Sequence, residues 1–510
     1  MSNSLLTIQR LLQPPQLVFC LFLLLLVRFT LFFVSYLEAR RQFPGPPVSS
    51  MWFGNLSETM SDDIHDKWRA WHSKYGPIYQ TWNSIFSRVI YVGDPRVVSK
   101  IANSNWPKIP TQYSGFKPLS GSALFAQMDQ ERWKQQRKGL APAFQPQTVN
   151  EQYPTLQKYL MKFIEEIDGA AKHGSLIDFS TLDVLLTLDF VGEVAFGTEL
   201  NAIRDGENCR ILQIFHDVLP ELMKCGLFPF RAKIPIMKST RLMHRGIKDL
   251  RELAYIAVQS ARASDDETKP ESGTGSKRIF EILALQRGAN GGYLFSAKEL
   301  VDNYVTFLVA GGDPTAHAIT FAIYEILKKP DVLTKLQAEL DTLLPHDCEV
   351  PTIEQVSRLR YLNFIIKETL RYNGPGFGTF RYTSTDVEIN GYKLPANTTL
   401  ALWNPQVHRD PNLWGPDADE FSPDRWYTKD GQTALEGPRF IPTPGSYFPF
   451  SYGPRKCLGE GLAMLEMSLT LATLFKRYDL TLQERFNMEF LPSFTLCSKN
   501  GLPVEARLRV

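Results

Sequence analysis

Cys457 is the residue whose surroundings in this sequence are best suited to binding a metal. It ends a loop that contains Gly453, Pro454 and Arg455, and an apolar helical pattern over residues 462–475 follows it. Free backbone N–H groups and the positive end of the helix dipole favour a thiolate over a thiol at a helix start, and the charge of Arg455 acts in the same direction. A lone cysteine before a helix is more often structural, so the surrounding pattern has to decide.

That pattern is F-x-x-G-x-R-x-C-x-G, with Phe450, Gly453, Arg455, Cys457 and Gly459 at the fixed positions. It matches the haem-binding loop of the cytochrome P-450 superfamily at every fixed position, and the resemblance extends from about residue 52 to the C-terminus. The resemblance implies the cytochrome P-450 fold, which is mainly α with small β-sheets. It also implies haem b as the cofactor, with Cys457 as the axial ligand of its iron and Phe450, Arg455 and Gly459 as further haem-binding residues.

Two further motifs of the family concern charged residues. Glu368 and Arg371 form its E-x-x-R motif, and Arg425 lies in a segment, residues 421–426, that resembles its F-x-P-x-R-W signature. Residues at i and i+3 share a helix face, so Glu368 and Arg371 can form an ion pair. An exposed pair of this kind is an ordinary feature worth under about 1 kcal/mol. The resemblance implies instead a buried group of three charges behind the haem loop.

Another group of residues is expected to hold the haem propionates. Trp133 and Arg137 form the W-x-x-x-R signature of the family, and Arg381 and Arg455 occupy positions where it has further propionate ligands. An indole N–H and a guanidinium are donors without acceptor capacity, which suits a carboxylate partner. Read without Cys457, the same residues would be a core tryptophan and solvated arginines.

A long helix is predicted to cross the domain. Ser296 and Glu299 form a capping box, and the helical pattern runs to Pro330, which gives a length on the order of 50 Å. Its interior contains Ala-Gly-Gly-Asp-Pro-Thr at residues 310–315, a combination that a stable helix avoids. Such local violations are typical of functional sites.

The same interior resembles the A-G-x-D/E-T-T/S motif, where the family delivers protons for oxygen activation. Asp313 matches the acid, but Pro314 stands where the family has threonine, and Thr315 matches only the last position. Three outcomes are possible: Asp313 and water carry the protons, a proline kink swings Thr315 inward, or oxygen activation is weak. We predict Asp313 and Thr315 as catalytic residues; Pro314 could also merely fix a kink that the helix needs.

The resemblance implies a haem-dependent monooxygenase, because a cysteinate ligand favours the O–O cleavage that precedes attack on a C–H bond. An isomerase or dehydratase that needs no external electrons is the alternative, and a haem-binding electron carrier or sensor is a third possibility. No flavin or nicotinamide fingerprint occurs in the sequence. Electrons are therefore expected from an NADPH-cytochrome reductase or a cytochrome b-type donor, which could dock on Lys134, Lys138 and Lys456.

The segments that by resemblance line the substrate chamber, residues 307–313, 375–380 and 494–496, are mostly apolar or aromatic. They predict a hydrophobic small molecule, such as a secondary metabolite or a lipid-like compound, that arrives from the bilayer. Aromatic residues in such stripes are also common in protein cores, so the stripes alone do not define a ligand site.

Composition limits the other possibilities. The net charge of +2 and the lack of a long basic run argue against nucleic acid as a partner. Six dispersed cysteines, with no C-x-x-C pair, indicate free thiols in a reducing compartment. The polar segment at residues 264–277 is expected to be a surface loop, and the β-branched run at residues 88–92 a strand.

The N-terminus predicts a membrane anchor. Residues 17–37 are almost wholly apolar and long enough to span a bilayer, although Arg28 in the middle costs about 2.5 to 3.5 kcal/mol. A cleaved signal peptide would have a shorter apolar core. We predict an anchor at residues 1–43, a proline-rich hinge at 44–51 and the haem-thiolate monooxygenase domain at 52–510, with a single transmembrane helix in the endoplasmic reticulum and the catalytic domain in the cytosol.

Overall fold

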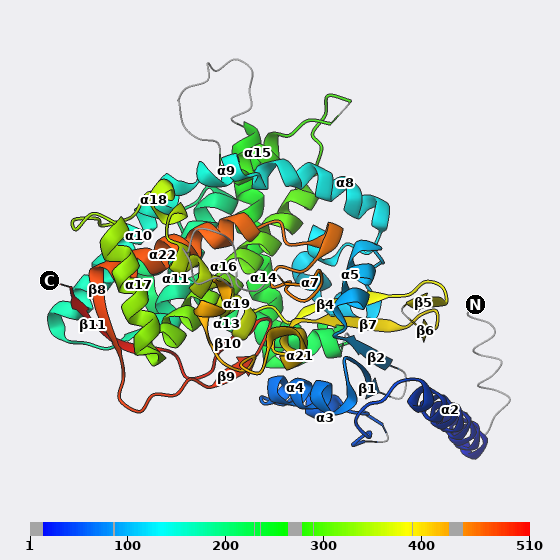
Figure 1. The fold of residues 1–510 in the computed structure, drawn as a ribbon. Coiled ribbons are helices and arrows are strands. Elements are labelled where there is room, and N and C mark those ends of the chain that lie inside the picture. The colour runs from blue at the N-terminus through cyan, green and yellow to red at the C-terminus, as the bar shows by residue number, and fades with distance from the viewer. Residues whose placement is uncertain are drawn as a thin grey trace.

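The computed structural model describes residues 14–50, 52–84, 87–228, 230–234, 236–263, 278–288, 290–389, 391–427 and 442–509. It is mainly α with small sheets, as the sequence predicts (Figure 1). The predicted surface loop at residues 264–277 lies outside the described residues. The helices of ten or more residues are α2 (Pro14–Gln42), α4 (Ile64–Tyr75), α8 (Gln130–Leu140), α10 (Tyr153–His173), α11 (Phe179–Phe196), α13 (Arg210–Leu227), α14 (Lys238–Ala263), α16 (Ala297–Lys328), α17 (Pro330–Leu343), α19 (Arg360–Tyr372) and α22 (Glu460–Arg477). The shorter helices are α3 (Leu56–Thr59), α5 (Pro95–Asn103), α6 (Pro110–Tyr113), α7 (Lys117–Ser120), α9 (Pro146–Asn150), α12 (Ala202–Asp205), α15 (Ile279–Leu285), α18 (Ile353–Ser357), α20 (Asn404–Val407) and α21 (Pro411–Trp414).

The predicted long helix is α16, which crosses the centre of the body (Figure 1). Ser296 caps it, since its side chain accepts from the N–H of Glu299 while the Glu299 side chain accepts from the N–H of Ser296. Its 32 residues correspond to about 48 Å, and it packs against α11, α14, α19 and α22. Pro314 stays inside the helix, so the backbone ladder lacks one donor there.

The middle of α16 has one accessible face, although the helix is otherwise mostly buried. Ala310 is exposed, and Phe307, Gly311 and Pro314 are partly exposed. These positions follow the spacing i, i+3, i+4 and i+7, which places them on one side of a helix. We call these four residues the accessible face of α16.

The sheets are small and lie beside the helical core. Their strands are β1 (Ile78–Ser84), β2 (Ser87–Val92), β3 (Ile177–Asp178), β4 (Gly378–Tyr382), β5 (Val387–Ile389), β6 (Tyr392–Leu394), β7 (Thr399–Trp403), β8 (Tyr478–Leu482), β9 (Phe490–Pro492), β10 (Leu496–Ser498) and β11 (Pro503–Leu508). The largest sheet has the order β1-β2-β7-β4, in which only β2 and β7 are parallel. The strand predicted at residues 88–92 is confirmed as β2. In this sheet, β4 carries Arg381 into the interior.

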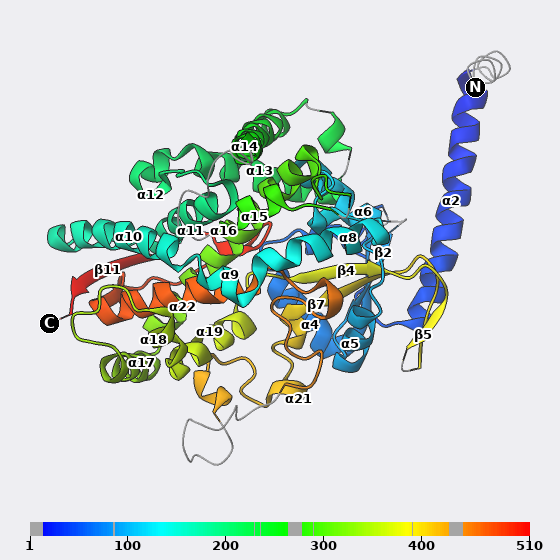
Figure 2. The same ribbon diagram turned by 90° about the horizontal axis from the view of Figure 1, so that it is seen from above.

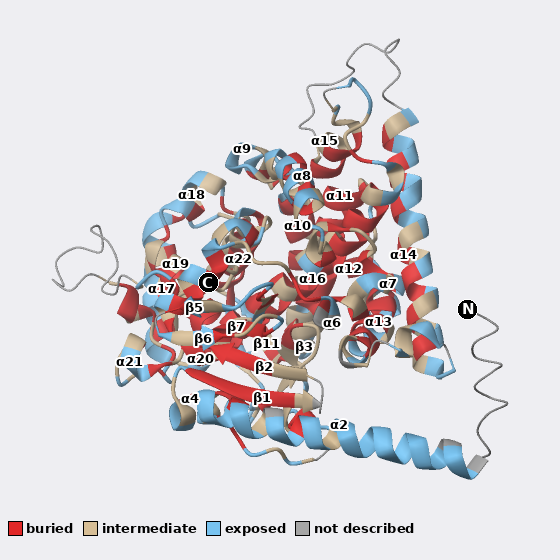
Figure 3. Cartoon of the chain, turned by 90° about the vertical axis from the view of Figure 1, so that its right-hand side faces the viewer, coloured by how far each residue is buried: buried red, intermediate tan, exposed pale blue. Residues whose placement is uncertain are grey.

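Helix α2 projects from one side of the body (Figure 2), and most of its side chains are exposed (Figure 3). An 18-residue window within Val18–Gln42 has a mean hydropathy of 2.5, which is apolar enough to cross a membrane. The end of the helix nearest the body packs against it, because the rings of Phe32 and Trp82 meet edge to face at 5.3 Å. The segment expected to be a hinge is also attached, since the N–H of Gln80 in β1 donates to the carbonyl oxygen of Pro44.

A buried ion network joins α19 to the long segment that follows β7. Glu368 accepts from Nη2 of Arg371 at 2.8 Å and from Nε of Arg425 at 2.8 Å. The indole N–H of Trp426 donates to the same carboxylate at 3.0 Å, and the three charged side chains are almost fully buried. Removing one member of such a network would leave an uncompensated buried charge, at a cost of roughly 3–5 kcal/mol.

His408 connects this network to the loop that carries Cys457. Arg371 donates to the carbonyl oxygen of His408 at 2.7 Å. The ring nitrogen Nε2 of His408 in turn accepts from the N–H of Phe448, two residues before Phe450, at 2.9 Å. Burial, followed by the charge of Arg371, lowers the pKa of His408 to about 3. The imidazole is therefore neutral in the folded protein, as an acceptor must be.

His408 should make the protein sensitive to acid. Because the pKa of His408 is depressed in the folded state, the contribution of this residue to the free energy of unfolding is complete above pH 6.5, the ordinary pKa of histidine. That contribution is lost as the pH falls toward 3. The free energy of unfolding should drop by about 1.4 kcal/mol per pH unit from this residue alone. Urea unfolding of the parent and of His408→Gln between pH 7 and 5 measures the difference in slope. The exposed His346→Gln variant is the control; equal slopes in parent and His408→Gln would show that the expectation is wrong.

Candidate active site

The loop before α22 places Cys457 at the start of that helix. The N–H of Cys457 donates to the carbonyl oxygen of Phe450 at 2.8 Å, which closes the loop, and Gly459 is the N-terminal cap of α22. Gly453 has φ +71°, and a Cβ atom there would lie 2.6 Å from the carbonyl oxygen of Ala102. Glycine is therefore required at this turn for two reasons, its backbone conformation and its close contact with α5.

The electrostatics of Cys457 differ from the sequence expectation. Burial raises the pKa of the thiol and outweighs the N–H of Gly459 and the charges of Arg137 and Lys456, which lower it. We expected the helix start and Arg455 to dominate, but burial is the largest influence on the pKa of the thiol, and Arg455 is not among the main ones. The side chain nevertheless has accessible surface, so the thiol borders a space that a ligand could occupy. A metal bound there would deprotonate the thiol outright.

Three buried cations converge beside this space. They are Lys108, Arg381 and Arg455, which we call the cation cluster, and each is at most 9% exposed. The guanidinium of Arg455 lies 4.0 Å from the ring centroid of Trp133, and its Nε donates to Asn105 at 3.0 Å. Within the described part of the chain, Nη1 and Nη2 of Arg455 and Nε of Arg381 have no hydrogen-bond partner.

Mutual repulsion is visible in the pKa values of the cation cluster. Burial lowers the pKa of Lys108 well below its usual value, and the charges of Arg381 and Arg455 lower it further. Burial and the charge of Arg381 also lower the pKa of Arg455 to about 10. Among the described residues, none of these three cations forms a salt bridge with a carboxylate. Buried charges without a partner are costly, so the cluster fits an anionic ligand such as the propionates of a haem.

Arg137, the remaining residue predicted to bind a haem propionate, is placed differently from Arg381 and Arg455. It lies on α8 one turn after Trp133 and is half-buried. Burial lowers the pKa of Arg137, and the nearby Cys457 opposes this by raising it. The structure thus groups Trp133, Arg381 and Arg455 together and sets Arg137 on the side of the thiol. Its role as a propionate ligand stays a prediction.

On α16, the two predicted catalytic residues lie off the accessible face. Asp313 is buried and accepts a hydrogen bond from the hydroxyl of Thr495 at 2.5 Å. Nε2 of His317, one helical turn later, lies 3.3 Å from the other carboxylate oxygen. Thr315 is also buried, whereas Pro314 belongs to the accessible face.

Lys108 and His317 were not singled out as site residues from the sequence, and Thr495 was predicted only within a chamber-lining segment, residues 494–496, not as a partner of Asp313. The spacing of four residues between Asp313 and His317 on a predicted helix could have indicated that contact. No comparable signal exists for Lys108 or Thr495, because each meets its partners only through the tertiary fold.

Aromatic side chains pack next to the cation cluster and on the accessible face of α16. Phe494 packs edge to face on Phe116 at 5.8 Å and lies 6.2 Å from Phe125. Phe307 of the accessible face packs edge to face on Phe144 at 5.5 Å. These rings present apolar surface next to the cation cluster, since Nζ of Lys108 lies 4.5 Å from the ring of Phe125.

Comparison with known proteins agrees with this geometry. The sequence model of the family "Cytochrome P-450" matches residues 44–502. Cytochrome P-450 4d2 of Drosophila melanogaster is 28% identical over 90% of this chain and 93% of its own length. Cytochrome P-450 3A29 of Sus scrofa is 26% identical over 91% of this chain and 87% of its own length.

A solved structure gives the same result for the fold. The crystal structure of the cytochrome P-450DA haem domain superimposes with a TM-score of 0.80 at 22% identity, and covers 92% of this chain and 98% of that one. The family carries a haem whose axial ligand is a cysteine thiolate, which the loop of Cys457 and the cation cluster fit. The family match over residues 44–502, together with this fold, shows that the chain belongs to the cytochrome P-450 family and is a haem-dependent monooxygenase.

Proposed function

We propose that Cys457 is the thiolate ligand of the haem and that the cation cluster, with Trp133, holds the propionates. The observation that carries this proposal is the convergence of three buried cations, which form no salt bridge with a described carboxylate, together with a thiol that has accessible surface. The haem, when bound, would supply the oxygen chemistry of a monooxygenase. The chain's own groups orient it: Arg455 and Arg381 have free donors for carboxylates, and Gly459 offers an N–H toward the sulfur.

Replacing Cys457 by alanine should abolish thiolate ligation and leave the fold intact, because the side chain is small and lines a space instead of the packed core. The measurement is the carbon monoxide difference spectrum of the reduced protein. We expect a red-shifted Soret band in the parent and none in Cys457→Ala. The same band in both proteins would show that another residue binds the iron.

A matched variant separates iron ligation from propionate binding. Arg455→Leu should keep the shifted band but release haem to an acceptor protein several times faster, because a buried charge-assisted contact to the propionate is lost. Arg485→Leu, at an exposed position, should release haem at the parental rate.

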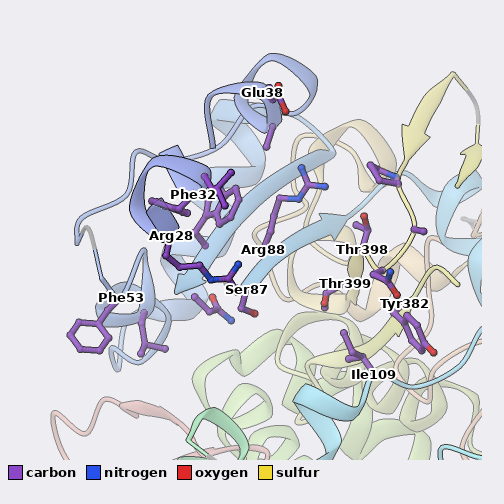
Figure 4. A pocket seen from close by; sticks show the side chains of 18 of the residues that line it. Arg28, Phe32, Glu38, Phe53, Ser87, Arg88, Ile109, Tyr382, Thr398 and Thr399 are labelled. Carbon is purple, nitrogen blue, oxygen red and sulfur yellow. The ribbon is translucent and has the colours of Figure 1, made fainter. Parts of the chain in front are cut away.

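The proposed substrate is a hydrophobic small molecule, for example a secondary metabolite or a lipid-like compound. The accessible face of α16 and the rings of Phe116, Phe125 and Phe494 are apolar, and Asp313 is already engaged by Thr495 and His317. A groove of about 1920 Å³ runs between α2 and the edge of the β1-β2 sheet (Figure 4). It is lined by Ile109 and Tyr382, the sequence neighbours of Lys108 and Arg381, and would admit such molecules from the membrane side.

Hydrophobic ligands should therefore displace water near the iron and change the absorbance of the ferric protein. Titration with a panel of apolar compounds, each paired with a more polar analogue that carries a carboxylate or an ammonium group, measures the preference. We expect saturable spectral shifts for the apolar members and at least about tenfold weaker ones for the charged analogues, because the aromatic rings and the accessible face of α16 carry no charge that could pair with theirs. Tighter binding of a charged analogue would contradict the proposed substrate class.

The proposed electron donor is a membrane-bound NADPH-cytochrome reductase, with a cytochrome b-type protein as a possible second donor. Lys134, Lys138 and Lys456 are exposed on the cysteine side, which gives an acidic partner a docking surface. Lys134 and Lys456 already form ion pairs with Glu131 and Glu460, so the attraction is smaller than three free charges would give. Helix α2 would anchor the body to the cytosolic face of the endoplasmic reticulum.

Sealed microsomes that contain this protein and a reductase test the partner and the orientation together. Added NADPH, which does not cross the membrane, should reduce the haem and produce the carbon monoxide band without permeabilisation. The initial rate should fall with rising salt, because exposed charges are screened. A band that required detergent would place the body on the lumenal side, and a salt-independent rate would argue against docking on the lysines.

A further inference from the structure

Both oxygens of the Asp313 carboxylate are in contact with other side chains. The hydroxyl of Thr495 donates to Oδ2 at 2.5 Å, and Nε2 of His317 lies 3.3 Å from Oδ1. Asp313, Thr495 and His317 are 7%, 7% and 8% exposed. A buried acid with two fixed partners can keep a single orientation at the centre of α16.

Thr495 is well positioned for this contact. It lies in the turn that joins β9 to β10, where its carbonyl oxygen accepts from the N–H of Ser493 at 2.9 Å. The next residue, Leu496, donates its N–H to the carbonyl oxygen of Pro375 at 2.9 Å. Phe494 packs on Phe116 on the other side of the turn. The hydroxyl therefore reaches Asp313 from a hairpin that is fixed at three points.

No hydroxyl on α16 itself takes this place. Pro314, the residue after Asp313, has neither a hydroxyl nor a backbone N–H. Thr315 lies two residues from Asp313, about 200° round the helix, and within the described part of the chain its hydroxyl forms no hydrogen bond to Asp313. The hydroxyl that contacts the acid comes from a segment 182 residues away in the sequence.

We infer that Thr495 is the positioning alcohol of Asp313, and that it supplies from the C-terminal hairpin the hydroxyl that Pro314 cannot supply from the helix. The inference rests on the proposed haem site, because the acid has a proton to deliver only there. It makes the β9–β10 turn part of the proton path, in addition to its apolar contribution from Phe494.

The proton balance of the pair is simple. The oxygen of Thr495 can accept a proton from a hydronium ion, which becomes water, while it releases its own proton to Oδ2 of Asp313. The hydroxyl is unchanged after each transfer, and the carboxylate becomes a carboxylic acid that can release the proton toward the accessible face of α16. No oxidant or second reactant is consumed in this step.

His317 limits the motion of the acid, because its Nε2 lies beside Oδ1 of Asp313. Within the described chain, its Nδ1 has no hydrogen-bond partner. The other titratable neighbour, Cys497, does not compete, because burial and the charge of Asp313 raise the pKa of its thiol to about 12.

The contact is tested first by a thermal double-mutant cycle on the full-length ferric protein in lipid nanodiscs. Thr495→Val removes the hydroxyl at nearly constant shape, and Asp313→Leu removes both acceptor oxygens. We expect Thr495→Val to lower the unfolding midpoint by a few degrees in the parent and by less than about half of that in the Asp313→Leu background. Equal shifts in the two backgrounds would overturn the contact. This cycle needs neither reductase nor substrate.

Proton transfer is tested by the solvent isotope effect on NADPH oxidation with an added flavoprotein reductase. Thr495→Val should slow oxidation about three- to tenfold and enlarge the isotope effect, because a positioned proton donor contributes at least that much. Thr495→Ser should restore both values to within about twofold. Ser498→Ala, which removes a hydroxyl from the same hairpin that donates to Gly501, is the matched control. A larger isotope effect in Thr315→Val than in Thr495→Val would assign the role to Thr315 and overturn the inference.

The carbon monoxide spectrum distinguishes a failure of the proposed haem site from a failure of the role inferred for Thr495. A shifted Soret band in the parent and in Thr495→Val, combined with an additive cycle, would reject the role of Thr495 and leave the haem site intact. No shifted band in the parent would reject the haem site itself, whatever the cycle gives.

Discussion

The buried carboxylate of Glu368 is the interaction on which the positions of distant segments depend. It binds Arg371 on its own helix and Arg425 from a segment more than 50 residues later, and Arg371 continues to the carbonyl oxygen of His408. His408 then binds the N–H of Phe448, close to the start of the Cys457 loop. Since a break in this chain leaves a buried charge or acceptor uncompensated, the loop that presents the thiol is tied to the stability of the whole helical core.

The cation cluster imposes the opposite constraint. Lys108, Arg381 and Arg455 repel one another in a buried setting and lack carboxylate partners among the described residues. Folding brings these charges together at a cost that a bound dianion would offset. Haem binding and the stability of this region are therefore linked, and the linkage is strongest where β4 and the Cys457 loop meet.

The local parts of this architecture could be predicted from the sequence, and the long-range parts could not. The capping box of α16, the helix after Cys457 and the strand β2 follow from short patterns. The sequence predicted a lowered pKa for the Cys457 thiol, whereas in the protein without a bound metal the pKa is raised. Burial, which cannot be predicted from the local sequence, outweighs the local charges. Lys108 and Arg381 are neighbours in the cation cluster although more than 270 residues separate them in the sequence. Thr495 contacts Asp313 only because a hairpin folds back onto α16. Neither contact therefore has a local sequence signature.

Pro314 also changes what the accessible face of α16 offers to a bound molecule. In a regular helix the N–H of residue 314 would donate to the carbonyl oxygen of Ala310, and proline removes that donor. Ala310 is exposed on this face, so an otherwise apolar wall contains one backbone oxygen with a lone pair to spare. A ligand with a single hydroxyl or amide N–H could donate a hydrogen bond to this oxygen, which would fix its orientation. A pure hydrocarbon would make no such bond and would bind in several equivalent poses.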